Sequence, residues 1–500
     1  MPDPKAFSGE VKVASSIVDY LSSGLYESPA ACMKELVNNS FDADATRVDI
    51  HVKPDADRII ISDDGSGMSQ KEFQNHFDHV SESHKRDSGE RTKKGRPKVG
   101  RIGIGFIAAN ELCERMEIVS TKRGSTDLLR VVIDFKKMRD PLRQRRDKDG
   151  AVTKGDYRGT RDKAPRDEHY TRIYLNEVRD NVRDVMVGAK PEAHTAGEDT
   201  LYGLGPESIS GRLADPHLRA WTDLNLYSQT MLEVGQNVPV KYAPDWVPSG
   251  LRRRLKDLEG DIESLDFVVK WDGTDVRKPV VLGHDASKLP QVLRRFEFKG
   301  EHVKARGYFF AQHGVLLPQE LNGLMIRIRN AGVGDYDSSF LGFRASEYQI
   351  VKRWVSGEIW ASDGLEDALN IDRRTLRVAH PAFVELQAAV HAELASFFRE
   401  ARKKLYEEPS TERKTNRARE QSSRIEEIAA RHEIPAPRVR PAAKARSQSS
   451  PDGTRQATRA MSRKYSASEL YDVALEVAKE ELPPTLFRKF AKALARRITQ

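Results

Sequence analysis

The sequence predicts an α/β fold in which helices cover one face of a mixed sheet, and three observations support this. Apolar and polar residues alternate, as in half-buried strands, at 47–53, 58–62, 116–121, 128–135 and 171–175. Helical patterns separate these segments, at 34–45 and 107–113. The two kinds of segment follow each other irregularly, which favours a mixed sheet over a purely parallel one.

The chain has 500 residues, which are too many for one hydrophobic core. We expect a first domain over 1–250, a second α/β domain over 251–404, a helical and then disordered basic linker over 405–464, and a helical hairpin over 465–500. Strand-like alternation within the second domain falls at 267–282, 306–310 and 324–329. The charged segment 136–168 is expected to be a loop without chemistry.

The cysteine content and the apolar segments of the sequence indicate the cellular compartment in which we expect the protein. The chain has two cysteines, Cys32 and Cys113, both in apolar patterns typical of helices. They form neither a disulfide framework nor a metal-binding spacing, which fits a reducing compartment. No apolar run is long enough to span a membrane, and residues 1–9 do not resemble a signal peptide. We therefore expect a cytoplasmic protein without membrane contact.

The basic character of the chain is concentrated near its C-terminus. Residues 401–500 hold 23 Lys and Arg against 13 Asp and Glu, a net charge of +10, whereas the whole chain is +8. Residues 434–464 hold eight basic side chains and one acid, Asp452, and are rich in Pro, Ser and Ala. Such a composition cannot form a core. It suits either DNA binding through phosphate contacts or a plain solvated linker.

The C-terminal hairpin is expected to consist of helices over 466–479 and 484–498. Apolar side chains line one face of each helix: Leu470, Val473, Ala474 and Val477 on the first, and Leu486, Phe487, Phe490, Ala491 and Leu494 on the second. Two helices cannot bury both of these faces alone. We expect the hairpin to dock on a protein partner or on a second copy of the chain.

One predicted helix carries three polar residues at a helical spacing. Glu35, Asn39 and Asp42 stand at i, i+4 and i+7, which places them on one face, while Leu36 and Val37 point elsewhere. Together, these oxygens could orient a water molecule and hold a hard cation. The alternative is an ordinary amphipathic helix with a polar side.

Two glycine-containing segments follow that helix. Asp63 ends a strand and precedes Gly65 and Gly67, which permit positive φ angles and close backbone approach. Residues 100–105 have the spacing G-x-x-G-x-G before a helix, where free N–H groups and the helix dipole favour phosphate. This is not the dinucleotide-binding G-x-G-x-x-G, and no Gly-Lys-Ser/Thr of a P-loop follows.

The order of the three segments, E-L-V-N-N-S-F-D-A, D-D-G-S-G-M and G-R-I-G-I-G-F, resembles the GHKL ATPase superfamily. The first segment is most similar to MutL and MORC proteins, and the third to Hsp-type chaperones. The resemblance implies the Bergerat ATP-binding fold, with ATP and Mg²⁺ as cofactors. It implies that Asn39 coordinates the metal, Glu35 activates the attacking water and Asp63 binds the adenine amine. Further nucleotide contacts are implied for Asp42, Gly65, Gly67, Met68, Gly100, Arg101, Ile102, Gly103, Ile104, Gly105 and Phe106.

Weaker matches extend the resemblance. Residues 69–99 are polar and glycine-containing, as expected of a mobile lid. Within them, V-S-E-S-H-K resembles a MORC box and implies that Ser83 and Lys85 contact the phosphates. Thr171 matches the family's fourth box, on the adenine side. L-N-I-D-R at 369–373 resembles the chaperone L-N-I-S-R, whose arginine reaches the terminal phosphate, and implies this role for Arg373.

The resemblance leaves several functions open. A DNA-acting clamp that forms a homodimer on binding ATP, as in MutL and MORC proteins, is favoured by the basic tail. A protein chaperone is favoured by residues 370–373. A non-hydrolysing ATP-sensing scaffold is the third alternative, and the presence of Glu35 argues against it. A histidine kinase and a topoisomerase subunit are disfavoured, because no phospho-acceptor helix or cleavage domain is evident.

Overall fold

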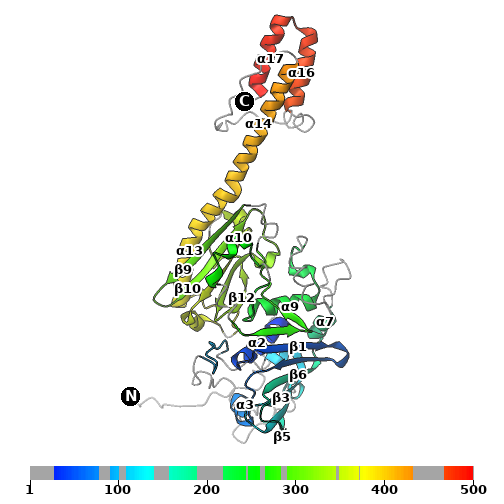
Figure 1. The fold of residues 1–500 in the computed structure, drawn as a ribbon, viewed down its shortest axis with the longest axis vertical. Helices are drawn as coiled ribbons and strands as arrows, with labels where there is room; N and C mark the ends of the chain where they lie inside the picture. Colours follow the sequence, from blue (N-terminus) through cyan, green and yellow to red (C-terminus); the bar gives the residue numbers. More distant parts are fainter. Residues whose placement is uncertain are drawn as a thin grey trace, which may run out of the picture. The chain divides into compact units, whose positions relative to one another are not determined.

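The computed structural model describes eleven segments of the chain, which form two compact units within residues 1–401 and 402–500 (Figure 1). The segments are 28–77, 91–100, 108–139, 157–188, 218–243, 246–258, 265–282, 290–344, 348–370, 372–431 and 467–498. None of the helices in these segments is both long and apolar enough to cross a membrane.

The first unit contains an eight-stranded sheet with the order β5-β4-β3-β6-β2-β1-β7-β8. Its strands are β1 (Arg47–Lys53), β2 (Arg58–Asp63), β3 (Cys113–Thr121), β4 (Asp127–Asp134), β5 (Tyr157–Lys163), β6 (Tyr170–Val178), β7 (Val268–Trp271) and β8 (Thr274–Val276). The pairing of β1 with β7 is parallel, and the other pairings are antiparallel. The sheet is therefore mixed, as the sequence predicts.

Alternation along the chain explains the centre of this sheet. In β1, Val48, Ile50 and Val52 are buried, and in β2 Ile59 and Ile61 are buried. The two strands pair antiparallel around the short 3-10 turn η1 (Pro54–Ala56). This confirms the predicted hairpin and sends β2 toward Asp63, where the strand ends.

Helices α2 (Pro29–Asp42), α5 (Ala108–Leu112) and α9 (Leu226–Asn237) pack together and share the hydrophobic core of the sheet (Figure 1). Helix α2 begins where the Ser28 hydroxyl accepts a hydrogen bond from the Ala31 N–H at 3.2 Å, and Pro29 occupies the first turn. The remaining helical segments are α3 (Gln70–Phe77), α6 (Phe135–Arg139), α7 (Asp180–Met186), α10 (Ser249–Arg252) and the 3-10 turn η3 (Trp221–Asp223). The predicted α/β class is confirmed.

Three local expectations were wrong. Segment 136–168 contains β5, which extends the sheet as its edge strand beside β4. Residues 268–276, expected in the second domain, form β7 and β8 of the first sheet, because β7 pairs with β1 across more than 200 residues of chain. Cys113 begins β3 rather than lying in a helix, although both cysteines are buried and free.

A second sheet follows within the same unit, with the order β12-β11-β13-β10-β9. Its strands are β9 (Gln291–Lys299), β10 (Lys304–Gln312), β11 (Gly323–Ile328), β12 (Ala331–Asp337) and β13 (Val355–Ala361). Helix α13 (Pro381–Ala401) packs on β9 and β10. The connections hold the short helical segments η4 (Gln319–Leu321), α12 (Gln349–Lys352) and η6 (Asp363–Ala368).

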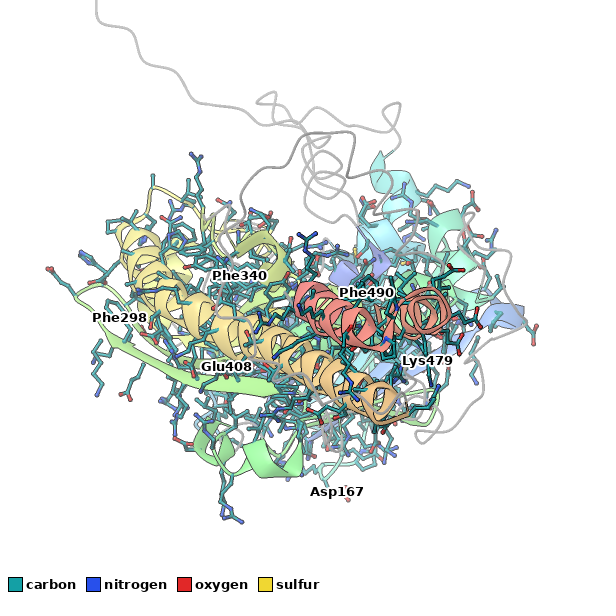
Figure 2. The ribbon with its side chains drawn as sticks, turned by 90° about the horizontal axis from the view of Figure 1, so that it is seen from above. Asp167, Phe298, Phe340, Glu408, Lys479 and Phe490 are labelled. Carbon is teal, nitrogen blue, oxygen red and sulfur yellow. The ribbon has the colours of Figure 1, made fainter. Side chains whose placement is uncertain are left out.

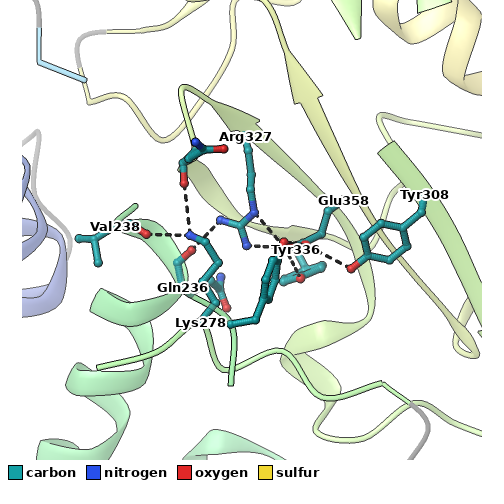
Figure 3. A network of polar contacts seen from close by, with 9 residues as sticks. Gln236, Val238, Lys278, Tyr308, Arg327, Tyr336 and Glu358 are labelled. Atoms are coloured by element: carbon teal, nitrogen blue, oxygen red, sulfur yellow. Dashed lines mark hydrogen bonds and ion pairs between the residues drawn. The ribbon is translucent and has the colours of Figure 1, made fainter. Parts of the chain in front are cut away.

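A buried polar network joins α9 to the second sheet (Figure 3). The guanidinium of Arg327 on β11 donates to the carbonyl of Gln236 at the end of α9, at 2.8 Å. Its other nitrogens bind the carboxylate of Glu358 on β13. Lys278 donates to the carbonyls of Val238 and Asn330, at 2.7 and 3.2 Å. The first sheet's helical layer and the second sheet therefore share one interior.

The second unit consists of the π-helical turn η7 (Arg402–Glu407), α14 (Glu408–Arg431), α16 (Ala467–Glu481) and α17 (Pro484–Ile498). Helices α16 and α17 lie side by side and carry Lys479 and Phe490 (Figure 2). This confirms the predicted helical hairpin. Residues of α14, α16 and α17 form its hydrophobic core: Ile425 and Ile428 from α14, Tyr471, Leu475 and Ala478 from α16, and Phe487, Ala491 and Ala495 from α17.

Candidate functional site

The polar face predicted on α2 is the accessible face of that helix. Apart from Pro29 at its start, every residue of α2 is buried except Glu35, Asn39 and Asp42, which are half-buried. Leu36 and Val37 lie in the hydrophobic core. The helix therefore presents one carboxylate, one amide and a second carboxylate at a partly open surface.

A lysine lies beside the first of these carboxylates. The Lys34 ammonium is 3.8 Å from a Glu35 carboxylate oxygen, and the two side chains are only 7% and 12% exposed. Burial lowers the pKa of Lys34, and the positive charges of Arg373 and Arg374 lower it further, whereas Glu35 raises it. Glu35 thus lies beside Lys34, which is itself close to the positive charges of Arg373 and Arg374.

Asp63 is buried at the end of β2. Its carboxylate accepts hydrogen bonds from the Ser40 hydroxyl and the Gly65 N–H, both at 2.9 Å. Burial raises the pKa of Asp63 to about 6, although these two donors oppose the shift. Asp63 also stands opposite Thr171 in the pairing of β2 with β6. The end of β2 therefore offers one buried acceptor whose pKa lies nearer to neutral pH than that of an ordinary aspartate.

At the two glycine positions after Asp63, neighbouring atoms leave no room for a side chain. A Cβ atom on Gly65 would lie 2.8 Å from an Asp63 carboxylate oxygen and 2.9 Å from the carbonyl oxygen of Ala43. Gly67 has φ +68°, and a Cβ there would lie 1.8 Å from the carbonyl oxygen of Thr121. The turn can therefore approach the sheet closely only because both side chains are absent.

Two residues that contact the turn after Asp63 were not predicted from the sequence. Ser120, fully buried in β3, accepts from the Met68 N–H at 2.9 Å and lies 3.0 Å from the Thr171 hydroxyl. His169 lies 2.7 Å from the Gly65 carbonyl oxygen through Nδ1. Both belong to segments without a motif, so only the pairing of β3 with β6 brings Ser120 and Thr171 together.

Asp42 anchors the start of the glycine-rich segment. Its two carboxylate oxygens accept from the N–H groups of Val99 and Gly100, at 2.7 and 2.8 Å. Helix α2 and the chain at Gly100 are therefore fixed to each other. The predicted phosphate contacts beyond this point, and those of the lid, lie outside the described residues: Ser83, Lys85, Arg101, Ile102, Gly103, Ile104, Gly105 and Phe106.

Arg373 reaches the same helix from the second sheet's side. A small cavity between α2 and the β11–β12 region is lined by Lys34, Asn38, Val99, Ile328, Leu369 and Arg373, among others. Arg373 therefore shares a cavity with the residue that precedes Glu35. Within the described chain, the buried Asn38 side-chain oxygen at this cavity has no hydrogen-bond partner.

Comparison with known proteins agrees with this geometry. Residues 26–147 match the family described as histidine kinase-, DNA gyrase B- and HSP90-like ATPase. The chain carries a GHKL ATPase domain. The matched residues include α2, the Asp63 turn and the glycine-rich segment.

Three relatives illustrate the mixed character of the GHKL domain. A protein named as a candidate type II restriction enzyme, HgiDII of Herpetosiphon aurantiacus, is 35% identical over 115 residues, 23% of this chain and 18% of the relative. The chaperone protein HtpG of Gluconobacter oxydans is 29% identical over 143 residues, 24% and 22% of the two chains. The DNA mismatch repair protein MutL of Afipia carboxidovorans is 44% identical over 61 residues, 12% and 10%. The chain thus matches about a fifth or less of the length of these relatives.

The donor set of the GHKL domain fits a magnesium ion that is bound together with a nucleotide. No group of three or more His, Cys, Asp or Glu side chains that could hold a metal occurs among the described residues. Glu35 and Asn39 nevertheless supply oxygen atoms on the accessible face of α2. Mg²⁺ keeps several waters and is commonly bound through one or two protein oxygens plus substrate phosphates, rather than by an all-protein cage.

Proposed function

We propose that this protein is a Mg²⁺-dependent ATPase that works as a nucleotide-gated dimeric clamp on DNA or on a DNA-associated complex. The observation that carries the ATPase part is the accessible face of α2, which holds Glu35 and Asn39 beside the buried acceptor Asp63 within a GHKL domain. A cytoplasmic location is part of the proposal.

In this mechanism, Asp63 accepts a hydrogen bond from the adenine amine, while Thr171 and Met68 line the adenine side. Gly65 and Gly67 let the backbone approach the base. The N–H groups of Gly103 and Gly105, with their neighbours Arg101, Ile102, Ile104 and Phe106, hold the phosphates at a helix start, and Gly100, whose own N–H binds Asp42, leads the chain into this segment. Ser83 and Lys85, in the predicted lid, contact the phosphates as well. Asp42 fixes the start of the glycine segment and thereby places its N–H groups.

Glu35 accepts a proton from the water that attacks the terminal phosphorus, as the bond between that phosphorus and the ADP oxygen breaks. Asn39 would hold the magnesium ion, and the ion would screen the charge of the phosphate oxygens. Arg373 meets the terminal phosphate, since a guanidinium matches phosphate oxygens in a two-point contact. Turnover is expected to be slow, because closure of the lid and the dimer precedes chemistry.

The C-terminal hairpin supports association with a second copy of the chain. Val473 and Val477 on α16 are 54% and 56% exposed, and Leu486 and Phe490 on α17 are 51% and 37% exposed. Helix α16 carries five acidic residues and one lysine, and α17 carries five basic residues and no acid. In a two-fold pair, the acidic α16 of one copy can lie along the basic α17 of the other, and both apolar stripes become covered.

DNA is the client favoured by composition. Residues 434–464 carry eight basic side chains against one acid, and MutL is among the relatives. The alternative is a chaperone ATPase that acts on protein clients, which the HtpG relatives and the position of Arg373 beside Lys34 favour. The third alternative is an ATP-sensing scaffold that does not hydrolyse the nucleotide.

The test is steady-state ATP hydrolysis by the wild type and Glu35→Ala, with and without double-stranded DNA at two salt concentrations. We expect Glu35→Ala to bind ATP but not to hydrolyse it, and DNA to stimulate the wild type less at high salt. Glu297→Ala, at an exposed position on β9, is the matched control and should behave as the wild type. Binding without hydrolysis in the wild type would establish the scaffold, and stimulation by unfolded protein alone would establish the chaperone.

A further inference from the structure

One buried carboxylate lies between two arginines at the cavity beside α2. Glu366, on the 3-10 helix η6, is ion-paired with Arg329 at 3.0 Å and with Arg373 at 3.8 Å. The side chains of Arg329 and Glu366 are each 4% exposed, and that of Arg373 is 13% exposed. The shorter contact and the deeper burial both belong to Arg329.

Arg329 is held firmly on its other side as well. It occupies the two-residue turn between β11 and β12 with Asn330, and both residues have positive φ angles, +53° and +68°. Its guanidinium also donates to the carbonyl oxygen of Lys98. Lys98 immediately precedes Val99 and Gly100, whose N–H groups bind Asp42. Arg329 therefore joins Glu366 to the chain that leads into the glycine segment.

Arg373 is the less constrained partner of Glu366. It lies in a turn that is closed by the β-bridge between Leu369 and Leu376. Its φ angle is +52°, a left-handed conformation that is unfavourable for residues other than glycine. Its positive charge also acts on Lys34, across the cavity that both residues line. An anion entering beside Lys34 would therefore meet Arg373 before it meets Arg329.

We propose that Glu366 is a positioning residue that retains Arg373 until a terminal phosphate competes for it, while Arg329 keeps Glu366 in place. This inference rests on the proposed ATPase function. In the absence of nucleotide, Glu366 neutralises the charge of Arg373 and holds its side chain toward η6. When a triphosphate is bound, the phosphate takes over Arg373, and Glu366 keeps its contact with Arg329. A diphosphate lacks the competing group and leaves the pair intact.

The test compares the affinities of ADP and of a non-hydrolysable ATP analogue for the full chain. In Glu366→Gln, Arg373 no longer has to leave a carboxylate, so the ratio of triphosphate to diphosphate affinity should rise about three- to tenfold with ADP affinity unchanged. In Glu366→Asp the shorter side chain keeps the carboxylate beside Arg329 but moves it away from Arg373. The ratio of triphosphate to diphosphate affinity should therefore shift in the same direction. Asp367→Asn removes an exposed carboxylate of the same 3-10 helix and should leave the ratio unchanged.

The double variant Glu366→Gln with Arg373→Ala should show the ratio of Arg373→Ala alone, because the effect of Glu366 acts through that arginine. An unchanged or lower ratio in both Glu366 variants would overturn the proposal. So would a parallel loss of ADP and triphosphate affinity, which would indicate a purely structural role. Absence of nucleotide binding in the wild type would instead overturn the ATPase function itself.

Discussion

Arg327 and Glu358 form an ion pair in which neither side chain is exposed to solvent at all. The carboxylate also accepts hydrogen bonds from the hydroxyls of Tyr242, Tyr308 and Tyr336 (Figure 3). Burial would raise the pKa of Glu358, but the Arg327 guanidinium, the Tyr242 hydroxyl and the Lys278 charge hold it below its ordinary value. Since Arg327 also binds α9, the pair contributes to the packing of two layers.

Glu358→Gln should therefore reduce the free energy of unfolding by about 3–5 kcal/mol, because it leaves the Arg327 charge buried without its counter-ion. Urea denaturation followed by tryptophan fluorescence measures this change. Asp257→Asn is the matched control, since it breaks the exposed pair between Arg295 and Asp257, and it should have little or no effect. A loss below about 1 kcal/mol in Glu358→Gln would contradict the interpretation.

Nucleotide affinity should fall as the pH drops through about 6. The folded pKa of Asp63 is raised to about 6 by burial, above an ordinary value near 4, so the protein without nucleotide loses stability as the pH rises from 4 to 6. Adenine binding needs the ionised carboxylate as an acceptor. The affinity for ADP should therefore approach a tenfold decrease per pH unit below 6.

Isothermal titration calorimetry at pH 5 to 8 tests this dependence. Glu233 is the control, because burial and Asp335 raise its pKa to about 7. Glu233→Gln should keep the decrease below pH 6. If the decrease disappears in Glu233→Gln, Asp63 is not its source.

Gly67→Ala should destabilise the GHKL domain more than Gly124→Ala. Both glycines have positive φ angles, +68° and +81°, so each substitution carries a left-handed penalty of about 1–2 kcal/mol. At Gly124 a Cβ has open space, whereas at Gly67 it would overlap the Thr121 carbonyl oxygen. Thermal unfolding of the two variants measures the difference, and equal melting temperatures would show that the turn relaxes freely.

The charges of the C-terminal hairpin should determine pairing between copies. Lys489→Glu with Lys492→Glu makes α17 less basic, and Glu476→Lys with Glu480→Lys makes α16 less acidic. The pairing of the hairpins does not depend on nucleotide, unlike the closure that ATP drives. Each double variant alone should therefore lose the hairpin-mediated dimer at low salt without nucleotide, and a mixture of the two should restore a heterodimer, as seen by light scattering after size-exclusion chromatography. Melting temperatures of each variant control for folding, and a mixture that stays monomeric would refute this pairing.

Local patterns were sufficient to predict the hairpin of β1 and β2 and the accessible face of α2, because each depends on residues close in sequence. The contacts of Asp42 with Val99 and Gly100 could not be predicted, since 57 and 58 residues separate the partners and neither shows a motif for the pairing. Arg329 likewise carries no local signal. Its contacts with Lys98 and Glu366 depend on the β11–β12 turn, which only the second sheet places.

The parallel pairing of β1 with β7 limits where the chain can be divided. A fragment ending at residue 250 would retain Glu35, Asp63 and Thr171 but would lack β7 and β8, so the backbone of β1 from Arg47 to Ile50 would become a bare edge. Bare edges of this kind invite strand addition by other molecules and aggregation. The fragment would therefore tend to aggregate through this exposed strand. A fragment that stays in solution has to extend beyond Val276, the last residue of β8.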